Sequence, residues 1–180
     1  EGIDPSEWKE SKKRMNILEK SADVSFKEVI ISLNVKSIII AAGLGSRLNK
    51  YTESLPKCML KFGKNTLLEM QLNIYRELGI TDISVVRGYK KEKINYEELN
   101  YYENTDFKNN NILNSLFYAD EKISGNVIVS YSDILFDSYV VKRLLESHAD
   151  ISIVVDIDWR GYYVDRQDHP IDEAEKVIFD

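Results

Sequence analysis

The sequence predicts an α/β fold, a Rossmann-like, mostly parallel sheet with helices on both faces. From residue 35 onward, short apolar runs of strand type alternate with segments that have helical spacing. The chain has 180 residues, of which 43% are hydrophobic and 30% charged, an ordinary composition for a globular protein. This length is sufficient for one substantial core.

Each element is predicted from a local pattern. The predicted strands are the apolar runs 35–42, 83–86, 126–130 and 151–155. The predicted helices are 67–78, 112–118 and 138–146. Gly79 is expected to end the first of these helices, and Asp137 to cap the last.

Residues 1–34 are predicted to be a helical appendage or linker. The alternative is that they are the tail of another catalytic module to which the chain is fused. Asp4, Pro5 and Glu7 place a cap, a first-turn proline and an acidic residue at the start of a helix. A second short helix is predicted after Ser25, with apolar residues at helical spacing: Phe26, Val29, Ile30 and Leu33. The catalytic domain is predicted to span residues 35–180.

Charge and composition exclude several classes of function. The 24 basic and 30 acidic residues give a net charge of −6, and no long basic run offers a surface for duplex nucleic acid. The apolar runs are too short to span a bilayer, so a cytoplasmic protein without a membrane segment is expected. Cys58 has no second cysteine to pair with, and His148 and His169 lack partners at metal-ligand spacing. Because no long basic run is present, any polyanion that binds is expected to be small.

A glycine turn follows the first predicted strand. Gly43 and Gly45 allow a phosphate to approach backbone N–H groups closely, and Arg47 adds positive charge. The turn is not a P-loop, because no Gly-Lys-Ser/Thr follows it, and Leu48 stands where a dinucleotide fingerprint needs its third glycine. Taken alone, the pattern fits a simple tight turn equally well.

A proline and a lysine, Pro56 and Lys57, follow ten residues beyond Arg47. Pro56 restrains the backbone, so the ammonium group of Lys57 is held in a fixed direction. A triphosphate requires such a group, because its charge must be neutralised before an oxygen nucleophile can approach phosphorus. Together the two motifs predict a nucleoside triphosphate site. The alternative is that Lys57 is an ordinary solvated lysine.

Asp133 follows the apolar run 126–130 and is predicted to be a Mg²⁺ ligand. Ligands of open α/β sheets bind beyond the carboxyl ends of the strands. Magnesium needs only one or two protein carboxylates besides water and phosphate oxygens. The alternative is that Asp133 caps the turn at 134–137.

Aromatic rings gather with carboxylates and arginines after residue 155. Aromatic faces next to carboxylates can hold an ammonium group, and arginines can hold a phosphate or phosphonate. The predicted binding site for a small molecule with both groups, called the acceptor site, consists of Asp158, Trp159, Arg160, Tyr163 and Arg166. The alternative is an exposed hairpin whose aromatic residues pack on the sheet.

These motifs resemble those of nucleotidyltransferases with the nucleotide-diphospho-sugar transferase fold, whose signature is A-A-G-x-G-S/T-R-L after an apolar strand and then a P-K pair. Residues 41–48 and 55–57 fit the signature, and residues 62–69 and 86–89 fit the segments that follow it. Within the family, the chain is most similar to bacterial phosphocholine and phosphonate cytidylyltransferases. That similarity rests on an asparagine-rich segment that includes Asn104, Asn111, Asn114, Ser115 and Leu116.

The resemblance implies Mg²⁺-dependent transfer of a cytidylyl group from CTP to a small acceptor, phosphocholine or 2-aminoethylphosphonate, with release of pyrophosphate. It assigns catalysis to Arg47 and Lys57 and the metal to Asp133. It assigns nucleotide binding to Ala41, Ala42, Gly43, Leu44, Gly45, Ser46, Gly88, Asn114 and Ser115.

Two other functions stay open: a sugar-1-phosphate nucleotidyltransferase, and a regulatory domain that binds the nucleotide without turnover. Members of the family run longer and bring a second acidic metal ligand from a late strand. The chain is therefore expected to be C-terminally incomplete as an enzyme.

Overall fold

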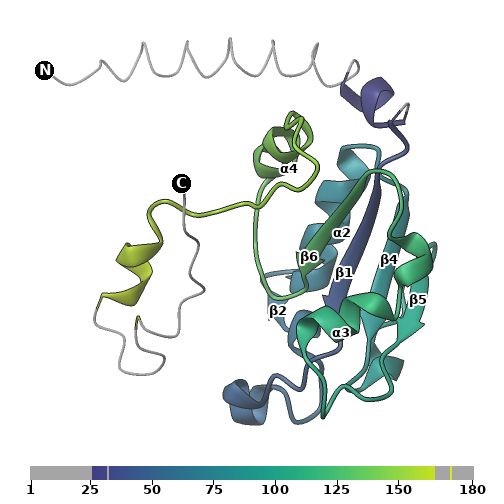
Figure 1. The fold of residues 1–180 in the computed structure, drawn as a ribbon. Coiled ribbons are helices and arrows are strands. Elements are labelled where there is room, and N and C mark those ends of the chain that lie inside the picture. The colour runs from purple at the N-terminus through teal and green to yellow at the C-terminus, as the bar shows by residue number, and fades with distance from the viewer. Residues whose placement is uncertain (1–25, 32, 165–170, 172–180) are drawn as a thin grey trace, which may run out of the picture. The chain divides into compact units, whose positions relative to one another are not determined.

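The computed structural model describes residues 26–31, 33–164 and 171 (Figure 1). The helix predicted to begin near Asp4 lies outside these residues. The described residues divide into two compact units, one that ends at Ser138 and one that begins at Tyr139. Among the described residues, none of the helices has both the length and the apolar character that a membrane span requires.

The first unit is built on a four-stranded sheet with the order β5-β4-β1-β6. Its strands are β1 (Lys36–Ala41), β4 (Asp82–Arg87), β5 (Asn100–Glu103) and β6 (Val127–Tyr131). All three pairings are parallel, which confirms the predicted sheet. Three strands lie within one residue of their predicted ends, whereas β5 was not predicted because it is short and only half apolar.

Helices cover both faces of this sheet, as predicted (Figure 1). On one face, Gln71 of α2 (Leu67–Glu77) accepts a hydrogen bond from Ser130 of β6 at 3.3 Å. On the other face, Leu116 of α3 (Ile112–Phe117) packs on a buried cluster formed by Ile38, Val86 and Ala119. The two contacts reach opposite faces because successive strand side chains alternate in direction.

The ends of α2 follow from local chemistry. Thr66 caps its first turn, since its side chain accepts a hydrogen bond from the Glu69 amide while the Glu69 carboxylate accepts one from the Thr66 amide. Gly79 follows the last turn with a φ of 86°, which confirms the predicted end. A short hairpin, β2 (Lys61–Phe62) and β3 (Asn65–Thr66), precedes the helix.

The second unit contains α4 (Ser138–Leu145) apart from its first residue, and a 3₁₀ helix, η5 (Trp159–Tyr163). The first of these confirms the predicted helix. The strand predicted at 151–155 is wrong, because these residues have no regular structure and Ile151 is 83% exposed. An apolar run forms a strand only where a neighbour supplies backbone hydrogen bonds, and among the described residues no strand pairs with it.

The glycines that follow β1 and β4 have different surroundings. A Cβ atom on Gly88 would lie 2.8 Å from the Cβ of Phe107 and 2.9 Å from the carbonyl oxygen of Ala42. A Cβ atom on Gly43 would have no neighbour within 4 Å. Packing therefore requires a glycine at 88, whereas no atom of the described residues lies close enough to require one at 43.

We expect Gly88→Ala to lower the free energy of unfolding by about 1 to 3 kcal/mol, because the new methyl group overlaps backbone that cannot move freely. Gly43→Ala, the matched control, should change it by less than about 0.5 kcal/mol. Urea unfolding at one temperature measures both values. Equal stabilities of the two variants would contradict the close packing at Gly88.

Candidate active site

An ion pair joins two residues that the sequence singled out separately. The ammonium nitrogen of Lys57 lies 2.7 Å from a carboxylate oxygen of Asp133, and each side chain is 35% exposed. Lys57 begins the 3₁₀ helix η2 (Lys57–Met59) immediately after Pro56, and Asp133 lies two residues beyond β6. The fold thus brings a cation and a carboxylate together near the carboxyl end of β6.

The exposure of this pair makes it easy to open. A partly exposed ion pair contributes at most about 1 kcal/mol, because water screens the attraction and both side chains lose freedom. Asp133 can therefore exchange its ammonium partner for another cation, and Lys57 can exchange its carboxylate partner for an anion. Both exchanges are available without breaking the core.

The glycine turn lies beside Lys57. Gly45 has a φ of 65°, and a Cβ atom on it would lie 3.1 Å from the Cγ2 atom of Thr52 and 3.4 Å from the Cβ atom of Lys57. Both the left-handed backbone and the close packing require a glycine here. Gly43 borders open space instead, so a ligand can approach its backbone closely.

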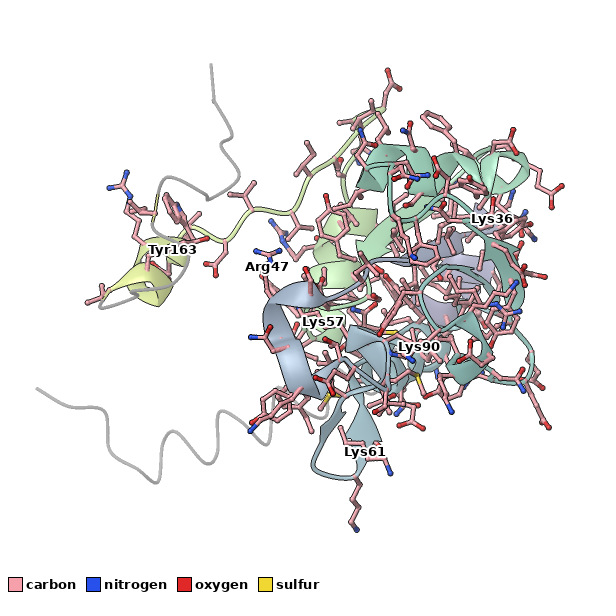
Figure 2. All side chains as sticks on the ribbon, turned by 90° about the horizontal axis from the view of Figure 1, so that it is seen from below. Lys36, Arg47, Lys57, Lys61, Lys90 and Tyr163 are labelled. Carbon is pink, nitrogen blue, oxygen red and sulfur yellow. The ribbon has the colours of Figure 1, made fainter. Side chains whose placement is uncertain are left out.

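Arg47 is exposed on η1 (Ser46–Tyr51), the 3₁₀ helix that follows the glycine turn. Figure 2 labels Arg47 and Lys57 and views the first unit from the end at which β1 stops. The preceding residues differ in access, since Ala41 and Ala42 are buried whereas Leu44 and Ser46 are exposed. Of the predicted nucleotide residues in this turn, the accessible ones thus begin at Gly43.

A cavity of about 470 Å³ adjoins the ion pair. Its walls are mostly apolar, and three charged side chains border it. The lining residues are Leu48, Tyr51, Lys57, Leu60, Lys61, Phe62, Leu67, Asp133 and Leu135. No sequence pattern predicts this cavity, because its walls come from four separate segments.

Other residues predicted to bind the nucleotide have partners within the protein. Ser115 is buried, receives a hydrogen bond from the Asn104 side chain at 2.9 Å, and donates to the carbonyl oxygen of Asn111 at 3.2 Å. Asn114 is exposed on α3, and its backbone N–H donates to the side-chain oxygen of Asn111. The asparagine-rich segment thus builds the loop and the cap of α3, and leaves the Asn114 side chain open to solvent.

Cys58 is next to Lys57 in sequence but is 1% exposed. Burial raises the pKa of its thiol to about 12, with a smaller effect of the nearby Asp133 in the same direction. The thiol is therefore neutral at physiological pH and has little nucleophilic character.

The predicted acceptor cluster lies in the second unit. The rings of Trp159 and Tyr163 meet edge to face with centroids 5.6 Å apart, and the guanidinium of Arg160 lies 5.6 Å from the Trp159 ring. These residues form η5 rather than a hairpin, and Asp158 is exposed just before it. Arg166 lies outside the described residues. The Trp159 ring thus already attracts one cation.

Comparison with known proteins gives related enzymes. Residues 37–170 match the model of the MobA-like NTP transferase domain. The CTP:phosphoglutamine cytidylyltransferase of Campylobacter jejuni is 28% identical over 79% of this chain and 61% of its own length. The choline-phosphate cytidylyltransferase of Streptococcus pneumoniae is 33% identical over 63% of this chain and 51% of its own length.

Solved structures agree with these matches. The CTP:phosphocholine cytidylyltransferase of Streptococcus pneumoniae superposes with a TM-score of 0.53 and 35% identity, over 55% of this chain and 45% of that one. The inositol-1-phosphate CTP transferase of T. maritima, with a TM-score of 0.54 and 24% identity over 64% of this chain and 49% of that one, shares the fold. The chain spans about half the length of the curated relatives it matches.

Proposed function

The chain belongs to the family of MobA-like NTP transferase domains, and we propose on this basis that it transfers a cytidylyl group from CTP to a small phosphate or phosphonate acceptor. The observation that carries the proposal is the exposed ion pair of Lys57 and Asp133 beside an open glycine turn. The choice of CTP is supported by the names of relatives, which include cytidylyltransferases for phosphoglutamine, choline phosphate and 2-aminoethylphosphonate.

The proposed reaction is a single displacement at phosphorus. An oxygen of the acceptor phosphate or phosphonate attacks the α-phosphorus of CTP, and the bond from that phosphorus to the oxygen bridging the α and β phosphates breaks. Pyrophosphate leaves with the electron pair of that bond. The backbone after Ala42 would hold the phosphates of CTP, and Arg47 would bind those that leave as pyrophosphate. Lys57 would draw the donor and acceptor phosphates together.

The residues present fit a Mg²⁺ ion. Asp133 supplies an accessible carboxylate at a strand end, whereas the described residues contain no group of three His, Cys, Asp or Glu side chains that would hold a metal by themselves. This donor set suits Mg²⁺, which binds through one or two carboxylates together with substrate phosphates. Bound there, the ion would supply positive charge to the phosphate oxygens.

The acceptor is proposed to be a phosphorylated amino alcohol or an aminophosphonate, with phosphocholine and 2-aminoethylphosphonate first. The support is the Trp159 ring, which has a guanidinium 5.6 Å from it and so offers a face on which an ammonium group can also lie. We propose a cytoplasmic location for the reaction, where CTP is available.

A screen of pyrophosphate release tests the proposed function. Four nucleoside triphosphates are combined with phosphocholine, 2-aminoethylphosphonate, phosphoglutamine and glucose 1-phosphate in the presence of Mg²⁺. We expect release only with CTP and an acceptor from the first three. Release with glucose 1-phosphate would instead support a sugar nucleotidyltransferase, and nucleotide binding without release would support a regulatory domain.

We expect Lys57→Ala to lower kcat at least about a hundredfold and to keep the fold, because it removes transition-state charge stabilisation from a partly exposed position. Lys61→Ala is the matched control, since it removes the same charge from the same cavity. Steady-state kinetics measures kcat, and circular dichroism measures whether each variant keeps the fold. A folded Lys57→Ala protein with wild-type turnover would rule out the assigned role.

We expect Trp159→Ala to raise the acceptor KM about five- to thirtyfold, because it removes the aromatic face for the ammonium group, while the KM for CTP changes little. Initial rates with each substrate varied in turn measure both constants. If both rise equally, Trp159 has a structural role instead.

A further inference from the structure

Tyr89 connects segments of the candidate site that are distant in the sequence. Its backbone N–H donates to the carbonyl oxygen of Ala42 at 3.1 Å, at the end of β1. Its hydroxyl donates to the carbonyl oxygen of Thr52 at 2.9 Å and lies 3.4 Å from that of Glu53. One residue thus contacts both the start and the far part of the loop between β1 and Lys57.

Thr52 links the Tyr89 contacts to the glycine turn. Its side chain is buried, and its hydroxyl lies 2.9 Å from the carbonyl oxygen of Gly45 and 3.2 Å from that of Asn49. Asn49 has a φ of 45°, which is unfavourable for a residue with a side chain. The loop therefore contains local strain, and contacts to its surroundings are needed to keep its shape.

The same loop sets the position of Lys57. A Cβ atom on Gly45 would nearly touch the Cβ atom of Lys57, so the turn and the lysine are close neighbours. Only three residues separate Glu53 from Lys57, and one of them is Pro56, which has a fixed φ. A shift at residues 52 and 53 would therefore move both the glycine turn and the ammonium group.

The ring of Tyr89 is held independently of its hydroxyl. It packs against Phe107 with ring centroids 6.3 Å apart. The close packing of Gly88 on Ala42 and Phe107 fixes the backbone just before it. The phenol oxygen is thus presented from a rigid base.

We propose that Tyr89 is a positioning residue, whose hydroxyl holds the loop from Gly43 to Lys57 in the shape that receives the phosphates of the nucleotide. This inference rests on the proposed function for the identity of the ligand, a nucleoside triphosphate. It assigns Tyr89 no contact with the reacting atoms. The role is to keep the glycine turn and the Lys57 ammonium at one fixed separation.

Tyr89→Phe tests the proposal, because it removes one oxygen and keeps the ring on Phe107. The readout is binding of inorganic tripolyphosphate to the full chain by calorimetry, which does not depend on the base or the acceptor. We expect the Kd to rise about three- to tenfold, the cost of one lost hydrogen bond in a preorganised site. The KM for CTP should rise similarly.

Tyr101→Phe is the matched control. Its hydroxyl donates to the carbonyl oxygen of Tyr96 at 3.0 Å and accepts from the Tyr96 backbone N–H, so the variant also loses phenol bonds to a loop of the first unit. We expect it to lower the thermal midpoint at least as much as Tyr89→Phe and to leave the tripolyphosphate Kd unchanged. An unchanged Kd in Tyr89→Phe, or an equal rise in Tyr101→Phe, would overturn the proposal.

The probe separates this inference from the proposed function. If wild-type protein binds tripolyphosphate but releases no pyrophosphate from CTP with any acceptor, the proposed reaction fails. The effect of Tyr89→Phe on the tripolyphosphate Kd still tests the positioning role. If wild-type protein does not bind tripolyphosphate, the phosphate site itself is overturned, and the positioning role with it.

Discussion

The parallel pairing of β1 with both β4 and β6 is the constraint on which the site depends. Parallel strands end at the same edge of a sheet, so the loops after all three strands emerge together. Two hydrogen bonds extend the pairing beyond the strands, from the Tyr89 amide to the carbonyl oxygen of Ala42 and from the Ser132 amide to that of Ile40. The glycine turn, Tyr89 and Asp133 are neighbours for this reason, although about 90 residues of chain separate the first from the last.

The ion pair at this edge suits a site that must accept both a cation and an anion. Lys57 and Asp133 neutralise one another, yet each stays one-third exposed, so water still solvates both groups. A fully buried pair would resist exchange, because leaving either charge unpaired in the interior is costly. The partly exposed pair avoids that cost. We propose that the arrival of a metal-bound triphosphate replaces each partner with a ligand whose charge has the same sign.

Sequence patterns predicted the parallel sheet and the two charged residues, because buried strands, strand-end carboxylates and a proline before a lysine are local signals. They assigned no role to Tyr89, although it ends the segment 86–89 that resembles the family, and none to Thr52, because hydrogen bonds to backbone carbonyls leave no sequence pattern. Gly43 and Gly88 looked alike in sequence, yet only Gly88 is enclosed by protein atoms. The run 151–155 has the composition of a strand, but pairing depends on a neighbour that composition cannot reveal.

The reaction proposed for this site requires Asp133 to hold a divalent cation together with the nucleotide. Titration with Mn²⁺, followed by the electron paramagnetic resonance of the free ion, measures this binding in wild-type protein and in Asp133→Asn, each with and without CTP. We expect weak Mn²⁺ binding to the wild type alone, much tighter binding when CTP is present, and loss of that gain in Asp133→Asn. Equal Mn²⁺ binding by the two proteins in the presence of CTP would contradict a metal-binding role of Asp133.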